Sequence, residues 1–192
     1  MEILVTLALG IGLASASGFR IFVPFTFLSM AALAGMVELS PTWDWIGTYP
    51  ALITFSIATL LEITAYYIPW LDNLLDTVAV PAAIVAGSVV TASVTTELSP
   101  LLTWTLAIIV GGGAAGVVQA GTTVLRSLSS VGSLGTGNFI VATSEWVAAT
   151  IFALLAILLP IFAALSALVI VILILRRLRR GRRPQHTAQP TA

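Results

Sequence analysis

The C-terminal part of the chain joins a long uncharged segment to a dense run of arginines. No charged residue occurs from Trp146 to Leu175, and six arginines follow between Arg176 and Arg183. A helix needs about 20 mostly apolar residues to cross the hydrocarbon core of a bilayer, so this segment is long enough to span one. Basic residues beside a span usually stay in the cytoplasm. The pattern therefore predicts a membrane protein with a cytoplasmic C-terminus.

The composition of the whole chain agrees with folding in lipid. Hydrophobic residues make up 58% of the sequence and charged residues 8%, whereas soluble domains carry about 25% charged residues. Outside the C-terminal run, Arg20 and Arg126 are the only basic residues. The chain has no cysteine, and its sole histidine is His186 in the tail. Ordinary zinc or haem ligation would lack ligands, so we expect no metal and no cofactor.

Five apolar segments predict an all-α, polytopic transmembrane helical bundle with about five spans. The segments are residues 3–35, 50–70, 78–96, 101–126 and 146–175. Backbone polar groups in lipid must be hydrogen-bonded within their own segment, so each segment is expected to be helical. Gly18 and Pro24 interrupt the first segment and Pro160 the last, which predicts kinked first and last helices. A first segment that re-enters or doubles back would raise the count to six.

The domain organisation follows from these segments. Residues 1–175 are predicted as a transmembrane domain and residues 176–192 as a disordered, arginine-rich cytoplasmic tail. The first apolar run resembles a signal peptide, but Met1-Glu2 is acidic and the run continues, so we expect it to be retained. The expected location is the bacterial inner membrane, that is, the cell membrane.

The loops are assigned to sides by the arginine tail. With five spans and a cytoplasmic C-terminus, the N-terminus is outside and residues 38–49 face the cytoplasm. Residues 72–76 and the connection 127–145 then face outward. The connection is rich in Gly, Ser and Thr, and we expect a flexible link or, alternatively, a re-entrant loop.

Glu62 is an ionisable residue deep within a predicted span. It follows Pro50 by 12 residues and precedes Trp70 by 8. A charge at that depth costs several kcal/mol unless it is paired, protonated or in contact with water, so such residues are usually functional. The alternative is a structural ion pair, for which Arg20 in the first segment is the expected partner.

One face of the fourth span carries small and then polar residues. Spacings of 4, 3, 4 and 3 place five residues on it: Gly112, Gly116, Gln119, Thr123 and Arg126. The two glycines allow another helix backbone to approach closely. The polar half indicates either a polar cavity or a packing face whose arginine reaches the headgroups.

Three further carboxylates lie near predicted span ends. Asp72 and Asp76 are four residues apart and could share a cation or a proton on one helical face. We favour a solvated turn that caps the third span. Glu145 closes the 127–145 connection at the mouth of the last span.

The order of these residues resembles a family of small bacterial membrane proteins, described as domain of unknown function 4126. The resemblance rests on Ala16-Ser17-Gly18-Phe19-Arg20, on Glu62 to Asp76 with Pro69 between, on the glycine-rich span ending in Arg126, and on Ser144-Glu145. It covers most of residues 3–165. The family implies a membrane architecture and no particular reaction or substrate.

The function predicted from these observations is transport of a small solute or ion, in a transporter or channel-like protein. The expected binding residues are Glu62, Arg20, Arg126, Glu145, Asp72, Asp76 and Gln119. The alternative is a non-transporting scaffold, assembly or lipid-binding protein whose buried charges are structural. An enzyme is not expected, because the spans hold no histidine for hydrolytic chemistry.

The expected partners follow from the composition and the tail. They are the lipid bilayer, an unknown small solute or ion, and anionic lipid headgroups at the arginines, each worth about 1 kcal/mol. A homo-oligomer is left open. Nucleic acid is not expected, because no aromatic or folded element accompanies the basic run.

Overall fold

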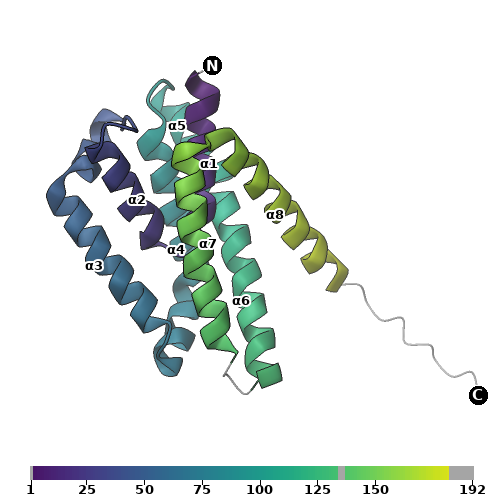
Figure 1. The fold of residues 1–192 in the computed structure, drawn as a ribbon. Coiled ribbons are helices and arrows are strands. Elements are labelled where there is room, and N and C mark those ends of the chain that lie inside the picture. Colours follow the sequence, from purple (N-terminus) through teal and green to yellow (C-terminus); the bar gives the residue numbers. More distant parts are fainter. Residues whose placement is uncertain (1, 134–136, 182–192) are drawn as a thin grey trace, which may run out of the picture.

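The computed structural model describes residues 2–133 and 137–181, and this part of the chain is built of helices without strands (Figure 1). In chain order the elements are α1 (Glu2–Ser17), α2 (Phe22–Leu33), the 3₁₀-helix η1 (Pro41–Gly47), α3 (Tyr49–Ala65), α4 (Pro69–Val94), α5 (Pro100–Leu106), the π-helix η2 (Ala107–Gly112), α6 (Gly113–Ser133), α7 (Asn138–Leu158) and α8 (Pro160–Gly181). The predicted all-α transmembrane bundle is confirmed.

Four stretches in the described part of the chain are long and apolar enough to cross a bilayer as single helices. They are Trp70–Val94, Pro100–Ser129, Phe139–Leu158 and Pro160–Arg177. Helices η1 and α3, which meet at a bend of 68°, are long and apolar enough to cross the bilayer if they are taken together as one span. Counting this pair brings the number of spans to five. The total agrees with the predicted number of spans, but the segments that supply the spans differ from those predicted.

The first apolar segment folds back on itself. After α2, Ser40 donates its backbone N–H to the carbonyl of Ser93 near the end of α4, at 2.8 Å. The Glu97 side chain, just beyond α4, is hydrogen-bonded to Glu2 at the start of α1, and this contact raises the pKa of Glu97 above its usual value. Both ends of the α1–α2 pair therefore lie where α4 ends (Figure 1). The expectation of a kinked first span is replaced by a helical hairpin.

The tip of this hairpin stops inside the bilayer. Helix α2 has 12 residues, or about 18 Å at 1.5 Å per residue, against a hydrocarbon core of about 30 Å. The turn at residues 18–21 sits against α6. A Cβ atom on Gly18 would lie 2.6 Å from the carbonyl oxygen of Ala115 and 2.6 Å from Cβ of Val118. Only glycine lets the chain reverse so close to the α6 backbone.

The last apolar segment is also two helices. Helix α7 ends at Leu158 and α8 begins at Pro160, where a proline is well suited to a first helical turn. Helix α8 then runs back alongside α6, since a Cβ on Gly121 would lie 2.9 Å from Cδ1 of Ile174. Instead of one kinked helix, the segment forms an antiparallel pair, and α8 continues past the predicted domain boundary at residue 175.

Two other predicted boundaries are wrong. The third span begins at Pro69 and not near Val78, so Pro81 lies inside α4. The 127–145 connection is mostly helical, because α6 continues to Ser133 and α7 starts at Asn138. The re-entrant element of this protein is the α1–α2 hairpin.

The revised helix order reverses the predicted sides of the loops. Figure 1 shows that α8 runs away from the end where α1 begins and toward the end that holds the α3–α4 and α6–α7 turns. We call this the arginine end. The loop at residues 38–49 lies at the opposite end, with the start of α1. A cytoplasmic arginine tail therefore places residues 72–76 on the cytoplasmic side, contrary to the sequence-based assignment.

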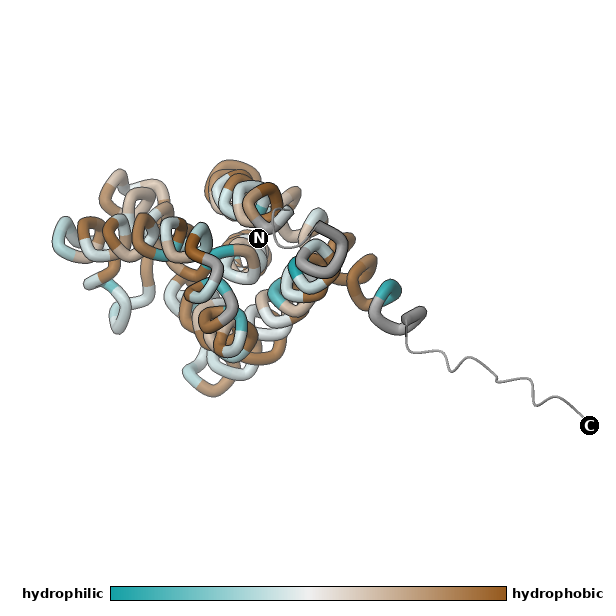
Figure 2. Tube along the Cα trace, turned by 90° about the horizontal axis from the view of Figure 1, so that it is seen from below, coloured by the Kyte–Doolittle hydropathy of each residue, from teal (hydrophilic) through white to brown (hydrophobic). Residues whose placement is uncertain are grey.

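The outer surface of the bundle is apolar. Figure 2 shows hydrophobic residues along all the helices, with hydrophilic ones scattered between them. Large apolar side chains such as Leu60, Ile109 and Leu165 are more than half exposed. In water such a surface would aggregate, so its solvent is lipid.

Candidate functional site

Arg126 on α6 is held by three carboxylates. Its Nε donates to Oε1 of Glu145 at 2.9 Å, and its Nη2 donates to Oε2 of the same residue. Its Nη1 donates to Oδ1 of Asp72 and to Oδ1 of Asp76, both at 2.8 Å. This geometry combines a two-point arginine–carboxylate pair with two single contacts, the arrangement that suits a planar guanidinium best.

Arg20 joins the same network from the tip of the α1–α2 hairpin. Its Nη2 lies 3.0 Å from Oε2 of Glu145 and donates to the carbonyl of Ala142 at 3.1 Å. Glu145 therefore bridges the two arginines. We call Arg20, Asp72, Asp76, Arg126 and Glu145 the polar cluster.

Tyr66, which caps the end of α3, adds an aromatic ring to the polar cluster. The guanidinium carbon of Arg20 lies 3.8 Å from the ring centroid, and that of Arg126 lies 4.1 Å from it. An aromatic face attracts a desolvated cation by about 2 kcal/mol. The ring thus helps to hold two like charges near each other.

The polar cluster is nearly closed to solvent. The side chains of Arg20, Arg126 and Glu145 are 1%, 3% and 3% exposed, while that of Asp76 is 20% exposed. Asp76 is thus its most accessible member. Among the described residues, the cluster holds three carboxylates against two guanidinium groups, so the formal charges of these five side chains sum to minus one. A buried excess charge of this kind favours uptake of a proton or another cation.

The solvated turn predicted for Asp72 and Asp76 is wrong. Both residues lie in the first two turns of α4 and face Arg126 on one side of that helix. The alternative prediction placed both aspartates on one helical face. The structure agrees with it, because α4 already starts at Pro69.

Glu62 does not pair with Arg20 as expected. Its Oε1 accepts the backbone N–H of Ile21 at 2.7 Å, and its Oε2 accepts that of Phe22 at 2.9 Å. These groups open α2, so Glu62 caps that helix from α3 and lies at the positive end of its dipole. Among the described residues it forms no ion pair.

The remaining predicted residues lie along η2, which ends at Gly112, and along α6, which follows it. Gln119 is 2% exposed, and its amide nitrogen has no hydrogen-bond partner among the described residues. Gly112 and Gly116 lie against α4, since added Cβ atoms would fall 3.0 Å from the carbonyl oxygen of Ile84 and 2.7 Å from its Cγ1. The half of this face that carries the two glycines therefore packs on α4. The polar half ends in Arg126, which belongs to the polar cluster.

Sequence reasoning missed two parts of the site. It gave Tyr66 no role beside the arginines, although the ring contacts both of them. It also missed Gly87 on α4 and Gly111 in η2, where the two backbones come closest: a Cβ on Gly111 would lie 2.7 Å from the Gly87 carbonyl oxygen. The isolated Gly87 in an apolar span was the available signal.

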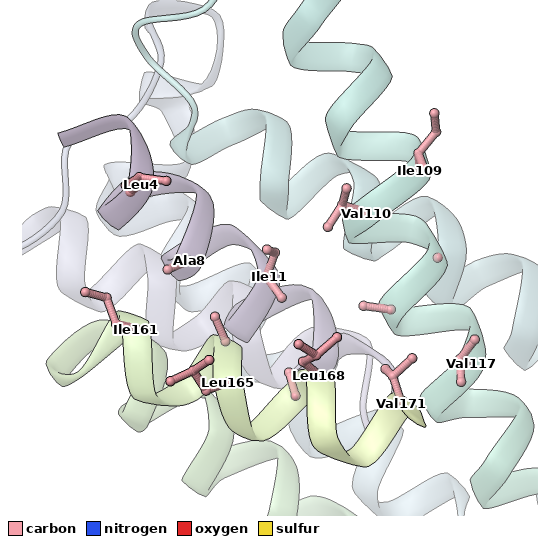
Figure 3. Close-up of a pocket in the computed structure, with 14 residues that line it drawn as sticks. Leu4, Ala8, Ile11, Ile109, Val110, Val117, Ile161, Leu165, Leu168 and Val171 are labelled. Atoms are coloured by element: carbon pink, nitrogen blue, oxygen red, sulfur yellow. The ribbon is translucent and has the colours of Figure 1, made fainter. Parts of the chain in front are cut away.

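A large apolar groove lies apart from the polar cluster. It has a volume of about 670 Å³ and runs between α1, η2, α6 and α8. Figure 3 shows its walls, which consist of Leu, Ile, Val, Ala and Gly alone. A groove without polar groups fixes no particular ligand, so the polar cluster is the candidate functional site.

The comparisons with known proteins identify a family and assign no role to the polar cluster. No curated protein and no solved structure matches the chain. The model of the family described as Domain of unknown function (DUF4126) matches residues 7–180. This range includes every member of the polar cluster, all of α2, α1 from residue 7 onward and all five spans. On this match the chain belongs to the DUF4126 family.

Proposed function

We propose that this protein moves a small ion or solute across the membrane, with the polar cluster as its binding site and a proton as the coupling or transported ion. The observation that carries the proposal is the position of Arg20: a charged side chain at the tip of a hairpin that ends within the bilayer. Charges at such depth usually mark an ion or substrate path.

The uneven charge of the cluster supports a proton as the ion. Three carboxylates share two guanidinium groups, and Asp76 is the carboxylate with the most access to solvent. Protonation of Asp76 would balance the cluster without moving a helix. Asp76 lies toward the arginine end of the bundle, so the site would open on that side of the membrane. The positive-inside rule assigns this side to the cytoplasm.

The competing function is a membrane scaffold or assembly protein. It is favoured by Arg126, whose four described hydrogen bonds are all to carboxylates. A guanidinium so fully bound can serve to lock α4, α6 and α7 together. This reading predicts that the cluster never changes its protonation state.

Proton flux in liposomes separates the two functions. The purified protein is reconstituted with a trapped pH-sensitive dye, and a potassium diffusion potential, negative inside, is imposed with valinomycin. Transport predicts acidification of the lumen faster than in protein-free liposomes, either directly or on addition of solutes from a panel. Equal rates under all these conditions would favour the scaffold.

A further inference from the structure

A crevice between α2, α3 and α4 opens on the lipid-facing surface. Helix α3 packs on α2 and η1 and stands away from α4 along much of its length (Figure 1). The space between has a volume of about 310 Å³. Leu61 on α3 and Val78 on α4 line it and are 65% and 53% exposed, so its mouth faces outward. Both helices lie within the membrane, and the solvent at that mouth is therefore hydrocarbon.

Glu62 lines this otherwise apolar crevice. Of the eleven residues around it, only Glu62 and Tyr66 carry polar side-chain atoms. The carboxylate is held in place by the N–H groups of Ile21 and Phe22. These contacts are neutral, and no described cationic side chain forms an ion pair with Glu62. Arg20 and Arg126 attract the Glu62 carboxylate from beyond ion-pair distance. The crevice therefore presents one carboxylate, with no cation in direct contact, at a lipid-facing opening.

We propose that this crevice binds a small lipophilic cation, such as an alkylammonium, with Glu62 as its counter-ion. A ligand that arrives from the hydrocarbon must be lipid-soluble, and a carboxylate in an apolar site selects a positive head. A volume at the low end of the ~300–1,000 Å³ range of ligand sites indicates one short chain or one ring. This site borders the polar cluster at Tyr66 but uses none of the cluster's charged residues. It does not require that the protein transports anything.

The probe is n-octyltrimethylammonium, and its neutral carbon isostere serves as the control ligand. Binding is measured by equilibrium dialysis against the protein in nanodiscs of zwitterionic lipid, with empty nanodiscs subtracted. We expect saturable binding of the cation, at least about ten-fold tighter than that of the neutral isostere, because only the cation is attracted by the Glu62 carboxylate in this apolar site.

Two variants test the location of the site. Glu62→Gln removes the charge, and Val78→Trp fills the crevice from α4 without touching the carboxylate. Val85→Trp is the matched control, since Val85 lies two turns further along α4, is 62% exposed and does not line the crevice. We expect both test variants to lose about ten-fold or more in affinity, and Val85→Trp to bind as the wild type does.

The outcomes decide the proposal even if Glu62→Gln fails to fold, because Val78→Trp keeps Glu62. Loss of binding in Val78→Trp with retention in Val85→Trp supports the site. Binding that survives Val78→Trp, or a wild-type protein that binds the cation no better than the isostere, overturns it. Binding without flux in liposomes would contradict the proposed transport function and leave this site standing.

Discussion

Arg20 and Glu145 join the tip of the α1–α2 hairpin to α7, with Nη2 and Oε2 3.0 Å apart and both side chains at most 3% exposed. They are 125 residues apart in sequence. Glu145 also holds Arg126, so this contact fixes the hairpin in the same network that fixes α4 and α6. The hairpin and the polar cluster are therefore expected to form or fail together.

Arg20→Ala should destabilise the protein strongly. The substitution leaves Glu145 with one arginine and leaves the cluster with three carboxylates on a single guanidinium. Breaking a buried ion pair in this way costs about 3–5 kcal/mol. Thermal unfolding in mild detergent measures the change, and Arg176→Ala, at an exposed arginine on α8, is the control. Equal melting temperatures for the two variants would show that the hairpin tip is not held by Arg20.

Glu62→Gln should also lower stability. Both carboxylate oxygens accept backbone N–H groups, and an amide offers only one acceptor. The unsatisfied N–H at the start of α2 costs about 1–3 kcal/mol. Glu38→Gln, at an exposed glutamate beyond α2, provides the comparison. A melting temperature for Glu62→Gln that matches this control would mean that Glu62 does not cap α2.

Gly111→Ala should destabilise the bundle, whereas Gly113→Ala should not. The added Cβ at position 111 would meet the Gly87 carbonyl oxygen at 2.7 Å, while at position 113 nothing lies within 4 Å. Overpacking of this kind costs about 1–3 kcal/mol. Alanine at an open helical position gains up to about 1 kcal/mol over glycine. The two variants should therefore shift the melting temperature in opposite directions. Shifts of equal sign and size would contradict the close approach of α4 and η2.

The two ends of the bundle should lie on opposite sides of the membrane. The chain has no cysteine, so a single introduced cysteine can be labelled with a membrane-impermeant maleimide. Glu38→Cys should be labelled from outside intact bacterial cells, and Arg177→Cys only after the cells are opened. A C-terminal fluorescent-protein fusion should fluoresce, and a C-terminal alkaline phosphatase fusion should be inactive. Labelling of both cysteines from the same side would contradict the helix order.

The fold class could be predicted from the sequence because lipid imposes a simple rule. Uncharged segments of about 20 residues must be helical, and the predicted number of spans agrees with the structure. The identity of the spans could not be predicted. A glycine or proline marks a break such as those at Gly18 and Pro160, but the angle of the break depends on contacts with distant helices. At Gly18 the chain reverses completely, and α6 lies so close to this turn that a side chain would not fit.

The members of the site could be predicted better than their pairing. Buried charges in lipid need partners, which identified Arg20, Arg126 and Glu145 from the sequence. Which carboxylate meets which arginine depends on the direction of α2. In a straight first span Arg20 could have paired with Glu62. In the hairpin, Glu62 instead accepts the N–H groups at the N-terminus of α2, and Arg20 forms its ion pair with Glu145.

Proton flux through Asp76→Asn tests whether the polar cluster is a transport site. Asparagine keeps an oxygen that can accept the Arg126 Nη1 hydrogen bond, so the fold should persist, but it cannot bind a proton as the carboxylate does. Asp44→Asn, in η1 at the other end of the bundle, is the matched control. We predict that wild-type and Asp44→Asn liposomes take up protons under a negative-inside potential and that Asp76→Asn liposomes do not. Wild-type flux that persists in a folded Asp76→Asn protein would contradict a role for this carboxylate in proton transport.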